Sequence, residues 1–487
     1  MKSQQKSLIL VTVDCLRSDH VGFLGYSRPT TPFLDSLAND SYVFSSAIVA
    51  GAPTYYSFPP ILASRYPLAL GRDIVGLAPG EPSIASILSH AGYATAAFNA
   101  GNPYLSARFG YDQGFQFFRD FLDPSFWSAE NNEHSNGRPS FNQRVRGIAR
   151  GLGLGSVYDE LYFQYMHRAR KRELASFDKL RQFPDARVIV DEAVTWLRAV
   201  AGRPFFLWLH FMDPHGPYYP TDDALQLMDD ADISAELAYY LNQYWNRREL
   251  PPRRLRRYRD AIVCLYDGGI RWVDVQIGNL VHAVKDLGKW DDCIFACTAD
   301  HGEEFLEHGG RFHPQWSGKE ELVHVPLLVR FPELGALRTD AVFSQIDLPP
   351  TLLQAMNISV PPQFQGRSRL DELRSSTCSD EPVVIECTEA INPSRPQDRL
   401  SPRVLCIRDR KYKLVLRFGS QEQELYDLEN DPAEQRPIGE GRETAVRRRF
   451  LELAREHLGR AATGAESYQM SAKIRNFRHG ELMCQSQ

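Results

Sequence analysis

The sequence predicts an α/β fold: a large, mostly parallel sheet flanked by helices, with a small C-terminal α+β subdomain. Short, continuously apolar runs rich in β-forming residues recur up to about residue 331. Such runs are typical of strands that are buried on both faces. Helical stretches alternate with them, and this alternation is the pattern of an open α/β sheet. The length agrees, because 487 residues exceed what one small core organises.

The predicted strands each end close to a polar residue, and helices are expected between several of them. The strands are 7–14, 93–100, 203–213, 292–300 and 324–331. The helices are 83–93, 187–202 and about 255–289. Ser83 is expected to cap the first helix and Gly92 to end it.

Two segments interrupt this alternation. Residues 126–182 are polar and irregular at first and then basic and aromatic, so we expect an insertion over the edge of the sheet. Beyond residue 375, the stretches 403–418 and 423–431 predict antiparallel strands, and 443–460 predicts an amphipathic helix. The expected organisation is therefore a main α/β domain over 1–375, a subdomain over 376–460 and a tail over 461–487.

Composition excludes several classes of protein. The 56 basic and 61 acidic side chains give a net charge of −5, so no polycationic surface indicates nucleic acid. No run approaches the roughly 20 apolar residues that span a bilayer, and the apolar run 8–13 is too short for a signal peptide. The eight cysteines stand in apolar contexts and are expected to be reduced. We therefore expect a soluble cytoplasmic protein with no membrane partner, of unknown oligomeric state.

Candidate functional residues gather where the predicted strands end. These are Asp14, Asp213 with His215, and Asp300 with His301. Ligands of open α/β sheets bind beyond the carboxyl ends of the strands, so we expect these side chains at one edge. Taken singly, Asp14 could cap a helix and the others could belong to turns. Their joint occurrence favours a functional site.

Carboxylate and imidazole ligands suit a divalent metal ion, with Zn²⁺ or Mn²⁺ favoured over Ca²⁺ or Mg²⁺. A further ligand or a nucleophile is needed, and Thr54 in AGAPTYYSFPPILASRYP is the candidate. A free threonine hydroxyl is a poor nucleophile, whereas a metal-bound one is largely deprotonated. Pro59 and Pro60 could open a helix whose first N–H groups receive an anionic ester oxygen. The alternative is that Thr54 is a plain cap in a loop.

Several stretches resemble sulfatases and their relatives in the alkaline phosphatase superfamily. They include VTVDCLRSDHVGFLGY, RPFFLWLHFMDPHGPYYP, TADHGEEFLEHG and ELYDLENDPAE, which occur in the order of that family. The resemblance runs from about residue 7 to 435, which is nearly the whole chain. It implies the alkaline phosphatase-like fold, hydrolysis of an ester with the help of a divalent metal ion, and a small-molecule anionic ester as substrate.

The resemblance also implies roles for individual residues. Thr54 stands where the family places its nucleophile, counted back from residues 65–67 (RYP). His215 stands where the family keeps a substrate or leaving-group histidine, and His313 falls near a substrate-facing Lys or His, although a structural loop histidine is the alternative. The implied metal ligands are Asp14, Thr54, Asp300 and His301.

The departures from the family pattern carry chemical information. Sulfatases convert the cysteine of a Cys-x-Pro-x-Arg motif to formylglycine, and no cysteine here stands in such a motif. Cys15 replaces the second metal-binding aspartate of the family. The Gly-Lys-x-His pair is replaced by AGNPYLS, in which Asn102 is the polar stand-in for substrate binding. The Asp-Asn pair of many sulfatases is Asp300-His301.

These departures favour phosphate esters over sulfate esters. Formylglycine hydrate sheds sulfate by elimination, which a simple alcohol cannot do, whereas phosphothreonine can be resolved by in-line attack of water at phosphorus. The sequence thus predicts a metal-dependent hydrolase of phosphate mono- or diesters with Thr54 as nucleophile. His215 and His313 are expected to stabilise charge or to protonate the leaving oxygen.

Four alternatives stay open. The chain could be a sulfatase that works without formylglycine, a soluble phosphoryl or phosphoethanolamine transferase, or an inactive binding protein that keeps the fold. As a variant of the site, Asp213 could build a second metal position with His215 and His313.

Overall fold

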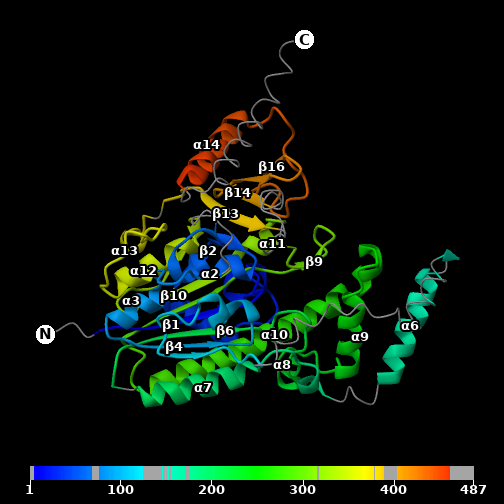
Figure 1. Cartoon of the computed structure of the whole chain (residues 1–487), viewed down its shortest axis with the longest axis horizontal. Helices are drawn as coiled ribbons and strands as arrows, with labels where there is room; N and C mark the ends of the chain where they lie inside the picture. The colour runs from blue at the N-terminus through cyan, green and yellow to red at the C-terminus, as the bar shows by residue number, and fades with distance from the viewer. Residues whose placement is uncertain are drawn as a thin grey trace, which may run out of the picture.

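Parallel strand pairing at the centre of the molecule determines where the functional residues can lie. The structure is a computed structural model and describes residues 5–67, 76–123, 145, 149, 151–152, 155–170, 176–200, 202–314, 317–377, 379–388 and 403–460. Within these residues the large sheet has nine strands, ordered β11-β2-β10-β7-β1-β6-β4-β5, with β12 paired to β2 (Figure 1).

The centre of this sheet is parallel, as the sequence predicts. Strand β1 (Ser7–Val13) lies between β6 (Phe205–Phe211) and β7 (Cys293–Ala299) and runs parallel to both. Strand β4 (Ala94–Asn99) pairs in parallel with the far side of β6. Every residue of these four strands is buried, because helices cover both faces of the sheet.

The predicted strand 324–331 exists as β10 (His324–Arg330), but it runs antiparallel to its neighbours β7 and β2 (Tyr42–Ile48). Strand β2 was not predicted, since two serines interrupt its apolar run. The sheet is completed by β5 (Phe117–Arg119), β11 (Leu337–Thr339) and β12 (Phe343–Ser344). The sheet is therefore mixed on one side of β7 and parallel on the other.

The helices form a layer on each face of the sheet (Figure 1). On one face, Ile9, Val11 and Val13 of β1 pack into a core shared with α7 (Ala186–Ala199) and α10 (Pro252–Asp286). On the other face, Leu8 and Leu10 pack with α2, α3 and α12. Successive residues of the strand thus pack against opposite helix layers, because side chains alternate between the two faces of a sheet. The bounds on the second face are α2 (Thr54–Ala63), α3 (Ile84–His90) and α12 (Leu348–Ala355).

The predicted helix signals hold for α3. Ser83 accepts a hydrogen bond from the Ser86 backbone and forms a capping box with it, and Gly92 follows the helix with a φ of 89°. The shorter helices are α1 (Pro32–Leu37), α8 (Asp222–Leu227), α9 (Ala235–Trp245), α11 (Glu320–Val323) and α13 (Leu370–Ser375), and two short strands, β8 (Glu304–Phe305) and β9 (Arg311–Phe312), pair with each other.

The expectation that Pro59 and Pro60 open a helix is wrong. Helix α2 begins at Thr54, and both prolines lie inside it. The carbonyl of Pro53 accepts hydrogen bonds from the backbone N–H groups of Tyr56 and Ser57, at 2.7 and 3.1 Å, which starts the helix one turn earlier. As a result, Thr54 is the first residue of a helix whose ten residues are all buried.

The C-terminal part forms a second sheet, ordered β16-β15-β14-β13-β3. Strands β14 (Arg403–Arg408), β15 (Tyr412–Arg417) and β16 (Glu422–Asp427) are antiparallel, and α14 (Thr444–Arg460) packs on them, as predicted. Strand β13 (Val383–Thr388), which was not predicted, pairs antiparallel with β14. The fifth strand, β3 (Gly51–Ala52), comes from the other end of the chain and pairs in parallel with β13. The residues just before Thr54 are therefore fixed by the C-terminal sheet.

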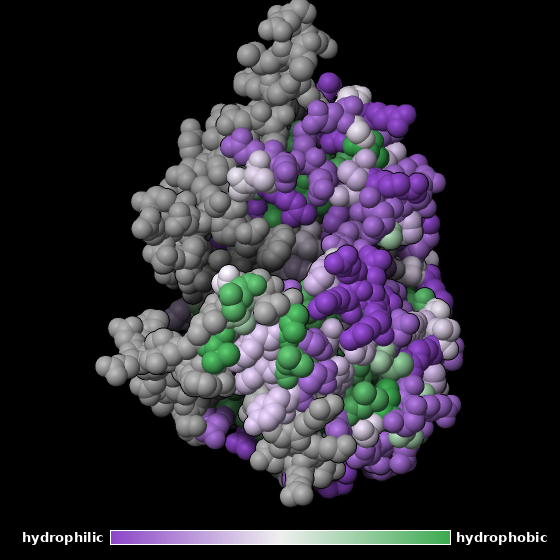
Figure 2. Space-filling model, turned by 90° about the vertical axis from the view of Figure 1, so that its right-hand side faces the viewer, coloured by the Kyte–Doolittle hydropathy of each residue, from purple (hydrophilic) through white to green (hydrophobic). Residues whose placement is uncertain are grey.

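The expected insertion 126–182 is described only in part, and 124–144 lie outside the described residues. Its described portion contains a helix, α6 (Gly155–Arg170). Val157, Leu161 and Tyr165 recur at a spacing of four on α6 and are more than half exposed. The side of the molecule that carries α6 faces the viewer in Figure 2, which shows apolar patches between polar ones.

Composition predicted that the chain has no membrane-spanning helix and that its cysteines are reduced. The described helices include none whose length and apolar character together match a bilayer span. Each of the six cysteines in the described residues is a free thiol, and five of them are buried.

The close approach of Gly51 in β3 to the backbone of helix α2 makes a testable prediction. A Cβ at position 51 would lie 2.4 Å from the carbonyl oxygen of Tyr56. We expect Gly51→Ala to lower the free energy of unfolding by about 1–3 kcal/mol through overpacking, measured by thermal and denaturant melting. Gly335→Ala is the matched control, because a Cβ there meets nothing within 4 Å among the described residues. Equal stability of the two variants would contradict the assigned packing.

Candidate active site

Two carboxylates meet where β1 and β7 end. Val13 and Ala299 are paired in the sheet, so the residues that follow them, Asp14 and Asp300, lie next to each other. Both side chains are fully buried. Asp300 Oδ1 accepts hydrogen bonds from the backbone N–H groups of Cys15 at 3.2 Å and His301 at 2.8 Å.

His301 joins these carboxylates to Thr54. Its Nε2 lies 3.0 Å from Thr54 Oγ1, 3.5 Å from Asp300 Oδ2 and 3.9 Å from Asp14 Oδ1. Its Nδ1 donates to the carbonyl of Gly302 at 2.9 Å, which leaves the Nε2 lone pair directed at the other three groups. The structure thus brings Asp14, Thr54, Asp300 and His301 to one point.

This cluster fits a divalent cation. One ligand atom each of Asp14, Asp300 and His301 lies within 4.8 Å of the other two. Asp300 Oδ2 is buried and has no hydrogen-bond partner within the described residues. Leaving such an atom unpaired costs about 1–3 kcal/mol, and a cation bound there would remove that cost. The oxygen and nitrogen donors are of the type that Zn²⁺ and Mn²⁺ accept.

The pKa values of the two carboxyl groups shift in opposite directions, although burial acts to raise both. Burial, and after it the adjacent charge of Asp14, together raise the pKa of Asp300 to about 7. Burial alone would raise the pKa of Asp14 as well, but the charge of His215 and the neighbouring imidazole of His210 hold it below its usual range. Asp14 is therefore the carboxylate that stays ionised, while Asp300 is sensitive to the loss of a neighbouring positive charge.

Two side chains orient Asp14. Asn102 Nδ2 donates to Asp14 Oδ2 at 3.1 Å, so the amide predicted to bind substrate also holds this carboxylate in place. His210 Nε2 lies 3.3 Å from the same oxygen, and its Nδ1 contacts Thr12 Oγ1 at 3.0 Å. Sequence reasoning missed His210. The signal that could have found it is a histidine inside the apolar run RPFFLWLHFMD, where it is completely buried.

Asp213 lies outside the cluster, although it also follows a strand. It forms a buried ion pair with Arg181 at 2.5 Å and accepts a hydrogen bond from the Ala186 backbone at 3.4 Å. Burial raises the pKa of Asp213 to about 6. The structure therefore gives Asp213 a structural partner in place of the second metal position considered from the sequence.

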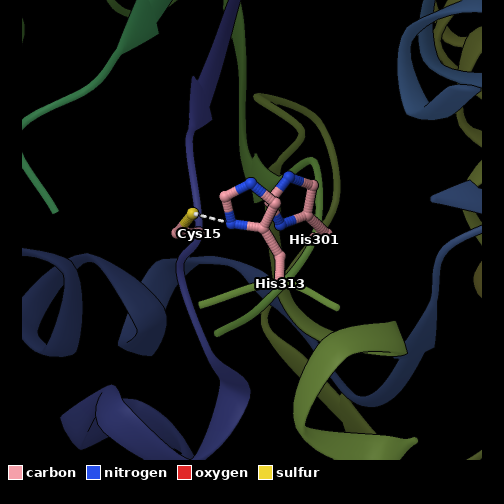
Figure 3. A group of neighbouring side chains, drawn as sticks. All are labelled: Cys15, His301 and His313. Atoms are coloured by element: carbon pink, nitrogen blue, oxygen red, sulfur yellow. Dashed lines mark hydrogen bonds between the residues drawn. The ribbon is translucent and has the colours of Figure 1, made fainter. Parts of the chain in front are cut away.

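Further histidines face the cluster from neighbouring loops. The rings of His301 and His313 lie 4.7 Å apart, and those of His215 and His313 lie 5.2 Å apart. His313 Nδ1 is 3.2 Å from Glu303 Oε2 and 3.6 Å from Cys15 Sγ, which Figure 3 shows pointing toward it. Glu303 is fully buried, and sequence reasoning missed it because it stands in a turn beside another glutamate.

A cleft of about 520 Å³ opens onto this group. Thr54, Asn102, His215 and His313 all line it. Its walls are largely apolar and aromatic, and they include Tyr55, Pro103, Tyr104, Phe121, Phe183 and Met212. Within the described residues, neither lysine nor arginine lines the cleft.

Comparison with known proteins identifies the class to which this fold and site belong. The model of the sulfatase family matches residues 6–358. A second model, of the C-terminal part of N-sulphoglucosamine sulphohydrolase, matches residues 307–455. The chain therefore belongs to the sulfatase family, whose members are ester hydrolases that bind a divalent metal ion.

Individual relatives cover nearly the whole chain at low identity. An arylsulfatase of Clostridium perfringens is 24% identical over 88% of this chain and 89% of its own length. The multifunctional alkaline phosphatase superfamily protein PehA of Trinickia caryophylli is 23% identical, with 88% and 90% covered. The crystal structure of a phosphonate monoester hydrolase of Agrobacterium radiobacter superposes with a TM-score of 0.64 at 19% identity, covering 94% of this chain and 96% of that one.

The orientation of Asp14 makes a prediction about His210. We expect His210→Phe, which keeps a ring of similar size but loses the ring nitrogens, to weaken metal binding about 10–100-fold. Competition with a chelator of known affinity measures the change. Unaltered affinity in a folded variant would contradict this role.

Asp213→Asn is the matched control for His210→Phe. It breaks a buried ion pair outside the cluster, so we expect a loss of about 3 kcal/mol in the free energy of unfolding. Its metal affinity should equal that of the wild type. A metal affinity that falls together with stability would place Asp213 back in the site.

Proposed function

We propose that this protein is a metal-dependent phosphoesterase whose nucleophile is the hydroxyl oxygen of Thr54. The supporting observation is the position of Thr54 Oγ1, buried and 3.0 Å from His301 Nε2 beside the two carboxylates. A threonine that only caps a loop would not require contact with a histidine and two carboxylates. The arrangement is that of a nucleophile held against a group of metal ligands.

The residues that would hold the ion are Asp14, Thr54, Asp300 and His301. A bound divalent ion supplies Lewis-acid chemistry: it lowers the pKa of a ligated hydroxyl and neutralises charge on phosphoryl oxygens. The chain itself prepares this site by fixing the tautomer of His301 through Gly302 and the orientation of Asp14 through Asn102.

Thr54 then attacks phosphorus in line with the leaving oxygen. The Oγ1 proton passes to solvent, a bond forms between Oγ1 and phosphorus, and the bond from phosphorus to the leaving oxygen breaks. The leaving oxygen takes up a proton from His313, and a phosphothreonine results. Water attacks the same phosphorus in a second step, which releases phosphate, or a phosphomonoester from a diester, and restores the hydroxyl. The position of Thr54 at the start of α2, held by Pro53 and β3, keeps its oxygen fixed through both steps.

His215 and His313 line the same cleft as Thr54. We assign protonation of the leaving oxygen to His313, and we assign to His215 the acceptance of a proton from the water of the second step. His215 Nδ1 donates to Gly216 O at 2.6 Å, so its Nε2 carries a lone pair when the ring is neutral. Burial lowers the pKa of His215, which favours that neutral form. Burial would also lower the pKa of His313, but the contact with Glu303 raises it above the usual value.

Phosphate is favoured over sulfate by the identity of residue 54. Threonine cannot be converted to formylglycine, so the elimination step by which sulfatases release sulfate is closed to it. A phosphothreonine is resolved by attack of water at phosphorus, and a phosphoryl group accepts this in-line displacement readily.

Substitution of Thr54 tests the proposal. We expect Thr54→Ala to lose activity on the order of 10³-fold or more and Thr54→Ser to retain turnover, because it keeps a hydroxyl. The assay is a panel of aryl phosphates, alkyl aryl phosphodiesters and aryl sulfates, with metal content measured for each variant. An active Thr54→Ala, or aryl sulfate as the best substrate of the wild type, would overturn the proposal.

The charge of the cleft makes a second prediction. Because lysine and arginine are absent from its described lining, the cleft has little positive charge for a dianion. We expect a phosphodiester, with one negative charge, to exceed the monoester of the same aryl alcohol about tenfold or more in kcat/KM, which corresponds to about 1.4 kcal/mol. Preference for the monoester would show that this charge argument fails, without bearing on Thr54.

A further inference from the structure

A separate group of potential metal ligands lies between the main domain and the C-terminal subdomain. His308 lies in the turn between β8 and β9, Glu321 lies in α11, and Glu434 follows the end of β16. One ligand atom of each lies within 4.8 Å of the other two. In Figure 1, α11 lies next to the C-terminal strands, and Glu320 N of α11 donates to Glu434 Oε2. Three segments that are far apart in the sequence thus bring one imidazole and two carboxylates together.

We propose that His308, Glu321 and Glu434 bind a divalent metal ion that holds the C-terminal subdomain against the loop between β8 and β9. One nitrogen and two oxygen ligands suit Zn²⁺ or Mn²⁺. None of the three residues lines the cleft or takes part in the reaction proposed for Thr54. This position is therefore independent of the proposed function.

The carboxylate of Glu321 is the group that indicates a ligand. Its side chain is 7% exposed, and its Oε1 is buried without a hydrogen-bond partner among the described residues. Within the same part of the chain its one ion-pair partner is His308, which is charged only when protonated. Buried charges need partners, and an ion shared with His308 supplies one at a pH where the imidazole is neutral.

The spacing of these two groups fits a shared ion. Bonds of about 2.0–2.1 Å to nitrogen and oxygen, at a tetrahedral angle, separate two ligand atoms by about 3.4 Å. His308 Nε2 and Glu321 Oε1 are 3.4 Å apart. A direct hydrogen bond between nitrogen and oxygen is usually shorter, at about 2.7–3.2 Å.

Glu434 is held in place and keeps oxygen lone pairs for a metal ion. It is 2% exposed, and its Oε2 accepts from Glu320 N at 2.7 Å. Its Oε1 lies 3.1 Å from Lys413 Nζ, and Lys413 and Arg408 both also pair with Glu320. A carboxylate has about four lone-pair sites, so these contacts leave sites for an ion. Contacts of this kind also orient metal ligands.

The position of the ion connects it to the active-site loop. His308 lies between His301 and His313 along the chain, and Glu303 N donates to the carbonyl of Glu321 at 3.1 Å. An ion that also binds Glu434 would hold this loop against the C-terminal subdomain. The same subdomain contains β13, which pairs with β3 just before Thr54.

Metal content tests the inference on the full-length chain. The protein is stripped with a chelator, reloaded with excess Zn²⁺, freed of unbound metal and analysed by elemental analysis. Loading is done at about pH 8, because Glu321 raises the pKa of His308 and a ligand must be the neutral imidazole. We expect His308→Gln to hold one zinc ion fewer per chain than the wild type. His457→Gln removes another histidine that contacts a buried glutamate, Glu386 at 2.6 Å, and as the matched control should hold as many ions as the wild type.

Asp300→Asn separates this position from the catalytic one. It should lose the ion of the active site and keep the ion bound by His308, so the double variant with His308→Gln should hold none. If the active site takes up no zinc, the difference of one ion between the wild type and His308→Gln still stands, so failure of the proposed function is distinguishable. Glu321→Gln serves as a second variant if His308→Gln does not fold, and it should also lose one ion.

Thermal melting gives a second readout, because an ion that binds only the folded state raises its stability. Added Zn²⁺ is expected to raise the melting temperature of Asp300→Asn and to leave that of the double variant with His308→Gln unchanged. Equal zinc content in the wild type and a folded His308→Gln, or an equal shift in melting temperature with and without His308, would overturn the proposal. The three side chains would then form an ion-pair cluster only.

Discussion

The pairing of β1 with β7 brings two carboxylates together inside the protein, and the surrounding groups offset the repulsion between them. Asp14 and Asp300 follow paired strand residues, and both are completely buried. Two carboxylates at roughly 5 Å repel by about 3 kcal/mol at an effective dielectric constant of 20. Backbone N–H groups offset part of this cost at Asp300, as Asn102 and His210 do at Asp14. The remainder is what a bound cation would relieve.

The central fold and part of the site were predictable because both follow from short-range patterns. Continuous apolar runs located β1, β4, β6 and β7, and the residues that end β1 and β7 supplied Asp14, Asp300 and His301. Parallel pairing then puts such ends at one edge whatever the intervening chain does. Thr54 has no such pattern: the stretch around it supplied only a candidate, with a loop cap as the alternative, and the family resemblance then placed it at the nucleophile position.

What could not be predicted depends on the direction of single side chains. Asp213 and His215 are two residues apart, yet Asp213 turns to Arg181 and His215 lines the cleft. His210 lies within a strand whose other residues are apolar, and only the packing shows that it reaches Asp14. Likewise, α2 starts at Thr54 because the carbonyl of Pro53 accepts the first hydrogen bonds of the helix. The residue preferences of Pro59 and Pro60 could not predict this start.

The segment before Thr54 is held by a strand that is synthesised much later. Its partner β13 (Val383–Thr388) lies more than three hundred residues further along the chain, and Glu386 N donates to Ala50 O at 3.1 Å. A nascent chain in which β13 has not yet been synthesised already contains Asp14 and Asp300 but lacks the strand that holds the segment before Thr54 in place. The geometry around Thr54 is therefore expected to form only after the chain has been synthesised beyond β13.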